Sequence, residues 1–171
     1  MKLLHIFFLS LVALFYIPTA KGATDFTMVN GRQGVFDAQT GRVLVAIADE
    51  SEAAGMPATI EKDGRTWTVA TTTLPIVSLD HGEVVSDSFL PGSMRLIHGD
   101  GTMEEFHTLL RYRGASALNY DKKNYAVKLT DANGEDMDAS LLGMRSDNSW
   151  ILDAMAADMA RMRNRVSTDL W

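Results

Sequence analysis

The chain contains no cysteine and only four prolines among its 171 residues. Without cysteine it can form no disulfide, offers no thiolate to a metal, and has no cysteine that could carry a lipid. A protein of this kind is held together by its apolar core alone, which is demanding for a small domain but feasible at this length.

Positive charge is also scarce. The sequence has 16 basic residues against 22 acidic ones, a net charge of −6. This balance argues against nucleic acid or an anionic membrane as a non-specific partner, because both attract proteins through clustered positive charge. It does not exclude a locally basic pocket for phosphate groups.

Residues 1–22 are predicted to be a cleaved signal peptide. The chain starts with a positive charge at Lys2, continues with an apolar run over residues 6–17, and reaches small residues up to Gly22. The run is shorter than the roughly 20 apolar residues of a membrane-spanning helix. We therefore predict a secreted, periplasmic or cell-surface protein with no stable membrane anchor after cleavage.

Residues 23–72 are predicted to form a small β-rich region. Apolar residues alternate along residues 41–47, which is the periodicity of a strand, and Asp63 and Gly64 form a turn between strand-forming residues. The acidic residues at 49–52 are expected in a solvated loop rather than at a metal.

Residues 73–171 have a different pattern, and we predict a domain boundary before them. Strands are expected over residues 74–79, 93–98, 106–112 and 124–129. From Asp153 onward, apolar residues recur at helical spacing: Met155, Met159, Met162, Val166 and Leu170. The predicted fold class is therefore α+β, with a β-rich N-terminal unit followed by a lobe of antiparallel strands and a C-terminal amphipathic helix.

The strand around Lys128 is the first candidate for nucleotide binding. Strand alternation places Tyr125, Val127 and Leu129 on one face, and Ala126 and Lys128 on the other. Protein kinases use a similar strand, in which a small residue precedes a lysine that contacts phosphates. The alternative is an ordinary lysine on the exposed face of a half-buried strand.

A second group of cations precedes this strand. Arg113 can form paired hydrogen bonds to a phosphate, Gly114 allows a positive φ or a close approach of a ligand, and Ser116 adds a hydroxyl donor. Lys123 adds positive charge between the two elements. The alternative is a strand that ends at a glycine turn, followed by solvated lysines.

No metal site is predicted. The acidic residues at 131–138 follow the Lys128 strand, and their spacing is slightly similar to that of a calcium loop. They lack the closing glutamate and flanking pattern of an EF-hand, so a solvated turn is the preferred interpretation.

Several of these segments together resemble the CotH (spore-coat protein H) kinase family over about residues 74–171. The ordered motifs are R-G-x-S at 113–116, K-K-x-Y-x-x-K-L at 122–129, L-L-G-M at 141–144, W-x-L at 150–152 and M-R-N at 162–164. The resemblance implies an atypical protein kinase that transfers the γ-phosphoryl group of ATP to Ser or Thr of a secreted protein. It also implies ATP and magnesium as cofactors of the complete domain.

The resemblance further implies that part of the domain is missing. The family's metal-binding and catalytic acidic residues lie downstream of the M-R-N helix, whereas this sequence ends at Trp171. We expect an incomplete kinase domain that is inactive alone, with no catalytic residue assigned and with Arg113, Ser116, Lys123 and Lys128 as nucleotide contacts. The alternative function is a non-catalytic secreted module that binds a glycan or a protein on a kinase-like scaffold.

Overall fold

The computed structural model describes residues 25–85 and 87–156. These residues form two compact units, which are described separately. The amino-terminal unit comprises residues 25–80 and Met94–Glu105, and the carboxy-terminal unit comprises His81–Ser93 and residues 106–156. The domain boundary predicted between residues 72 and 73 stays a prediction.

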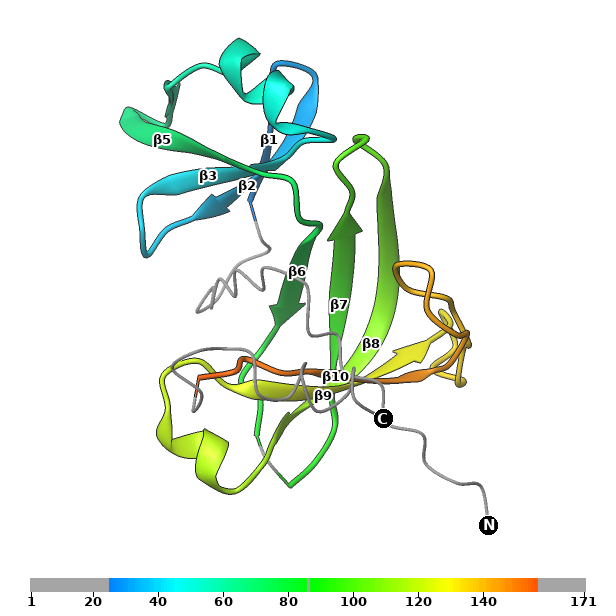
Figure 1. The fold of residues 1–171 in the computed structure, drawn as a ribbon. Helices are drawn as coiled ribbons and strands as arrows, with labels where there is room; N and C mark the ends of the chain where they lie inside the picture. Colours follow the sequence, from blue (N-terminus) through cyan, green and yellow to red (C-terminus); the bar gives the residue numbers. More distant parts are fainter. Residues whose placement is uncertain (1–24, 86, 157–171) are drawn as a thin grey trace. The chain divides into compact units, whose positions relative to one another are not determined.

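The described residues contain ten strands and two short 3₁₀ helices (Figure 1). The first sheet has the order β1-β2-β3-β5-β4, and the second has the order β10-β9-β8-β7-β6. The elements of the first half are β1 (Phe26–Val29), β2 (Arg32–Asp37), β3 (Arg42–Ala46), η1 (Glu50–Gly55), β4 (Thr59–Lys62) and β5 (Arg65–Thr72). Those of the second half are β6 (Ile76–His81), β7 (Leu90–Ile97), β8 (Met103–Arg113), η2 (Ser116–Asn119), β9 (Asn124–Thr130) and β10 (Ser149–Leu152).

The predicted α+β fold class is wrong. Over residues 25–85 and 87–156 the chain is almost entirely β, with no α-helix. The helix was predicted to start at Asp153, but Asp153 and Ala154 lie in irregular backbone after β10, and Met155 has a φ of 48°. The helical spacing of the methionines does not show that residues 153–155 follow β10 directly with irregular backbone. The rest of the predicted helix, residues 157–171, lies outside the described residues.

None of the helices in the described part of the chain is long and apolar enough to span a membrane. The predicted strands, in contrast, are present. The expected segments 41–47, 74–79, 93–98, 106–112 and 124–129 coincide with β3, β6, β7, β8 and β9 to within a few residues. These predictions are confirmed. They could be made from the sequence because apolar alternation and flanking turn residues are both local properties of a segment.

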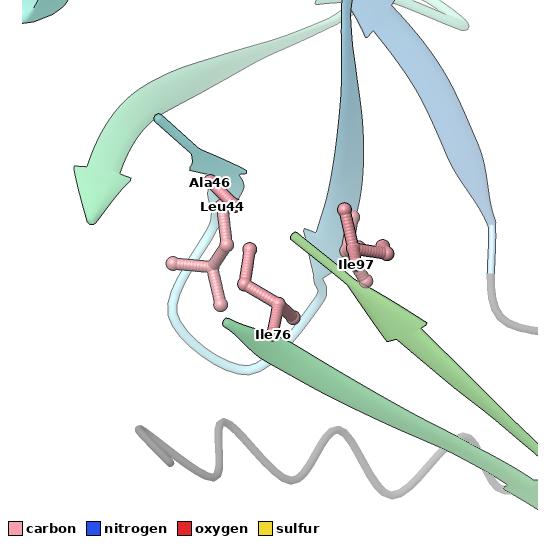
Figure 2. Close-up of a cluster of buried hydrophobic side chains, with 5 residues drawn as sticks. Leu44, Ala46, Ile76 and Ile97 are labelled. Atoms are coloured by element: carbon pink, nitrogen blue, oxygen red, sulfur yellow. The ribbon is translucent and has the colours of Figure 1, made fainter. Parts of the chain in front are cut away.

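The amino-terminal unit is built on the first sheet, in which β3 and β5 are parallel and the other pairs are antiparallel. Its core occupies both faces of the sheet. Figure 2 shows one cluster, in which Leu44 and Ala46 of β3 lie near Ile76 and Ile97. The other face carries a second buried cluster: Val29, Phe36, Val43, Val45 and Ile47. Strand β3 contributes to both clusters, so both of its faces are buried, and its sequence is accordingly a continuous run of apolar residues.

The carboxy-terminal unit has its core on one face of the second sheet. On β9, Tyr125, Val127 and Leu129 are buried, as the alternation predicted. Trp150 of β10 lies opposite Val127 and shares this face. The indole nitrogen of Trp150 donates a hydrogen bond to the backbone oxygen of Asp147 at 3.0 Å, which satisfies its polar group inside the core.

Candidate functional site

Among the described residues, strands β8 and β9 carry three Arg and Lys side chains on the face of the second sheet opposite this core. Antiparallel pairing sets Arg111 of β8 opposite Ala126 of β9, and it sets Leu109 opposite Lys128. Residues directly opposite each other, and residues two apart along a strand, share one face of a sheet. Arg111, Arg113 and Lys128 therefore lie on the same face, all half-buried.

The ring of Phe89 lies against two of these cations. The guanidinium carbon of Arg111 is 4.9 Å from the ring centroid, and the ammonium nitrogen of Lys128 is 5.3 Å from it. Both distances are within the range of a cation–π interaction. Phe89 directly precedes β7 and is itself half-buried. Within the described residues, no carboxylate forms an ion pair with Lys128.

Arg113 lies farther from Lys128 than Arg111 does. It is opposite Asn124, four residues before Lys128 on the same strand. Four residues of a strand span about 13 Å, so Arg113 and Lys128 mark the two ends of a row of cations. Arg111, between them, completes the row.

The loop after β8 holds Gly114 and Ser116. Gly114 has a φ of +85°, which confirms the positive φ predicted as one of its two roles and lets the chain turn out of the sheet. Ser116 is the first residue of η2 and is exposed. Ser116 thus follows Arg113 by three residues and lies beyond the end of β8.

Lys123 closes this same loop. Its ammonium group donates hydrogen bonds to the backbone oxygen of Leu118, at 2.7 Å, and to that of Tyr120. A lysine ammonium group has three donors, so two of them are used here to hold the end of η2. The structure therefore gives Lys123 a contact within the loop, next to β9, whereas Lys128 lies on the sheet face.

The acidic turn after β9 is arranged by its own hydrogen bonds. The carboxylate of Asp131 accepts hydrogen bonds from the backbone N–H groups of Glu135, at 2.9 Å, and Asn133, at 2.8 Å. The hydrogen bond from Glu135, followed by those from Asn133, lowers the pKa of Asp131 below its ordinary value of 3.8. In the part of the chain that the structure describes, no group of three or more histidine or acidic side chains is placed to hold a metal ion.

Sequence reasoning missed Arg111 and Phe89 as site residues. Arg111 precedes Arg113 by two positions, so strand periodicity already placed both on one face, and this signal was available. Phe89 is more than twenty residues away from Arg111 and carries no local motif. Its position depends on the pairing of β7 with β8, which no pattern within one segment reveals.

Comparison with known proteins identifies one relationship. Residues 110–171 match the family model described as CotH kinase protein. The resemblance predicted from the ordered motifs is thus confirmed for this part of the chain, which contains Arg111, Arg113 and all of β9. Residues 74–109, which were expected to belong to the same domain, lie outside the match. No curated protein and no solved structure matches the chain.

Proposed function

We propose that the carboxy-terminal unit is the phosphate-binding part of a CotH-type kinase domain in an exported protein. In this proposal the cationic face of β8 and β9 receives the triphosphate of ATP, and the complete domain transfers the γ-phosphoryl group to Ser or Thr of a secreted protein. The family match over residues 110–171 supports the relationship to these kinases. The proposed export rests on the signal-like pattern of residues 1–22.

One observation carries the proposal: three cations from two strands share a sheet face in a chain of net negative charge. A protein with a net charge of −6 has no general attraction for a polyanion. Binding of ATP would therefore depend on a local group of cations. The row formed by Arg113, Arg111 and Lys128 is such a group.

The described residues fit the phosphates of a nucleotide better than they fit its metal ion. Arg111 and Arg113 can donate paired hydrogen bonds to phosphate oxygens, and Lys128 acts as a point charge. Magnesium prefers carboxylate oxygens, and no group of three or more acidic or histidine side chains in the described residues is placed to hold a metal ion. We therefore assign phosphate contacts to this unit and assign no metal ligand.

Among the four residues predicted from the sequence, Lys128 and Arg113 are the proposed primary contacts. Arg111 joins them because the register places it between the two. Ser116 is exposed at the start of η2, and its hydroxyl can donate a hydrogen bond to a terminal phosphate that Arg113 contacts. Lys123 is proposed to act mainly by holding the loop, since two of its donors bind backbone oxygens.

Titration calorimetry with ATP, at low ionic strength and with and without magnesium, tests the proposal. We expect the full chain to bind ATP, and Lys128→Ala or Arg113→Ala to weaken binding about tenfold or more, because hydrogen bonds to charged groups contribute about 1.5–3 kcal/mol. Lys123→Ala is expected to have a smaller effect on affinity.

Arg42→Ala is the matched control. Arg42 is an exposed cation on β3 of the amino-terminal unit, so this variant removes the same charge from a different sheet. If Arg42→Ala weakened binding as much as Lys128→Ala, the interaction would be one of overall charge. Equal affinity of the wild-type chain and Lys128→Ala would contradict the proposed site.

A further inference from the structure

The sequence contains two Asn–Gly steps, Asn30–Gly31 and Asn133–Gly134, and their hydrogen bonds in the structure differ. We propose that Asn30 is a site of spontaneous deamidation, which converts it to aspartate or isoaspartate, whereas the fold protects Asn133 from the same reaction. The modification of Asn30 also releases the short helix η1 from the hairpin that carries this residue.

Deamidation begins when the backbone nitrogen of the residue after asparagine attacks the side-chain carbonyl carbon. A C–N bond forms, the attacking nitrogen loses its proton, and the side-chain nitrogen leaves as ammonia, which produces a cyclic succinimide. Water then opens the ring at either carbonyl, so the net reaction consumes water and releases ammonia. Glycine in the second position favours ring closure, because it has no Cβ in the way and tolerates the backbone rotation that closure requires.

Asn30 and Gly31 form the exposed turn between β1 and β2. Their φ values are 48° and 79°, as in the type I′ turn that an Asn–Gly step favours. The side-chain amide nitrogen of Asn30 donates an exposed hydrogen bond to the backbone oxygen of Gly55 at 3.1 Å. Among the described residues, the N–H of Gly31 has no backbone acceptor in this turn, so the attacking nitrogen is available.

Asn133 and Gly134 also lie in an exposed turn, but hydrogen bonds to Asp131 hold both residues. The carboxylate of Asp131 accepts hydrogen bonds from the side-chain amide nitrogen of Asn133, at 3.2 Å, and from its backbone N–H, at 2.8 Å. The N–H of Gly134 donates to the backbone oxygen of Asp131 at 3.1 Å. The attacking nitrogen and the leaving group are therefore both bound, and we expect ring closure to be slower here than at Asn30.

Deamidation of Asn30 alters a contact within the amino-terminal unit. The hairpin of β1 and β2 is fastened to η1 by the bond from Asn30 to Gly55 and by an ion pair between Arg32 and Glu52 at 2.7 Å. After deamidation, a carboxylate oxygen replaces the donating amide nitrogen, and an ionised carboxylate has no proton to donate. It then faces the backbone oxygen of Gly55, which is also an acceptor, so the bond is lost and the two groups repel.

Peptide mapping by mass spectrometry tests the difference between the two sites. The folded full chain is incubated at mildly alkaline pH, and aspartate and isoaspartate are measured at both positions in the same samples. We expect Asn30 to convert about tenfold faster than Asn133 or more, since the further hydrogen bonds at Asn133 must break before ring closure. Equal rates, or faster conversion of Asn133, would overturn the proposal.

The same time course in concentrated urea is the control for sequence context. The two rates should converge there, because both steps then have an unhindered glycine and no fixed hydrogen bonds. A difference as large in urea as in the folded chain would mean that the neighbouring residues, and not the fold, set the rates. That result would also overturn the proposed protection.

Asp131→Ala tests the source of the protection. The variant removes the carboxylate that holds Asn133, and it does so in the unit that does not contain Asn30. We expect conversion of Asn133 to accelerate by about three- to tenfold, while Asn30 converts at its wild-type rate and serves as the internal control. An unchanged rate at Asn133 would contradict the protective role of Asp131.

Hydrogen exchange tests the release of η1. Asn30→Asp carries the deamidated side chain, and Gln39→Glu is the matched control because it adds the same charge at another exposed position of the amino-terminal unit. The N–H of Met56 donates to the backbone oxygen of Ala53 at 3.1 Å and closes the end of η1. This N–H should exchange faster in Asn30→Asp than in Gln39→Glu. Equal exchange in the two variants would show that deamidation does not release η1.

Discussion

The side-chain oxygen of Asn124 accepts a hydrogen bond from the backbone N–H of Ala154 at 2.8 Å. The two residues are thirty positions apart, and the bond fastens the segment after β10 to the first residue of β9. Asn124 also lies opposite Arg113 in the β8–β9 register. One side chain thus fixes the end of the strand that carries Lys128 and the exit of the chain from the sheet.

Asn124→Ala is expected to destabilise the protein by about 1–2 kcal/mol. The variant removes the acceptor of a part-buried hydrogen bond and leaves the N–H of Ala154 without this partner. Urea unfolding followed by tryptophan fluorescence measures the change. Asn119→Ala, at an exposed position of η2, is the control and should leave the midpoint nearly unchanged. Equal stability of the two variants would contradict the fastening role of Asn124.

Gly114→Ala tests the turn that ends β8. With a φ of +85°, alanine at this position is strained, and its added Cβ would lie 3.4 Å from the Cβ of Ala117. We expect a loss of about 1–2 kcal/mol in the free energy of unfolding. Gly82→Ala is the matched control, because Gly82 has no positive φ and its Cβ would meet nothing within 4 Å. In thermal melts, the melting temperature of Gly114→Ala should therefore be clearly lower than that of Gly82→Ala.

Gly99→Ala tests close backbone packing in the amino-terminal unit. An added Cβ at Gly99 would lie 2.3 Å from the backbone oxygen of Ile47 and 2.7 Å from its carbonyl carbon. Backbone atoms cannot rotate away as a side chain can, so we expect destabilisation of about 3 kcal/mol. Chemical denaturation measures it. A change no larger than that of Gly82→Ala would show that the segments around Gly99 and Ile47 separate at little cost.

The sequence predicted local structure better than it predicted the site. Alternation along β9 placed Tyr125 and Val127 in the core and Lys128 on the other face, because strand periodicity is a property of one segment. The contact between Phe89 and Lys128 was not predictable in this way, since it depends on the order of strands in the sheet.

The error at the end of the described chain has a similar origin. Helical spacing from Met155 onward suggested a helix that begins at Asp153. The first residues of that segment follow β10 directly, and the carboxylate of Asp153 accepts a hydrogen bond from the N–H of Met155 at 2.8 Å. Met155 itself has a φ of 48°, which a right-handed helix does not allow. Periodicity counts apolar residues and takes no account of this backbone conformation.

Acid should weaken the turn after β9 through Asp131. Hydrogen bonds from the backbone N–H groups of Glu135 and Asn133 hold the pKa of this carboxyl below 3.8 in the folded chain. A lowered folded-state pKa means that the ionised form stabilises the fold above the unfolded pKa, and that this contribution is lost as the pH falls through the folded value. The loss is therefore expected below about pH 4.

Asp131→Asn separates this contribution from general acid denaturation. The variant should be less stable than the wild-type chain at neutral pH, because a neutral amide is a weaker acceptor than a carboxylate. The difference should shrink toward about pH 3, where the wild-type carboxyl becomes protonated as well. Urea midpoints measured across this range give the comparison, and Asp136→Asn, an exposed position in the same turn, is the control. A constant difference between Asp131→Asn and the wild-type chain at every pH would mean that ionisation of Asp131 does not stabilise the turn.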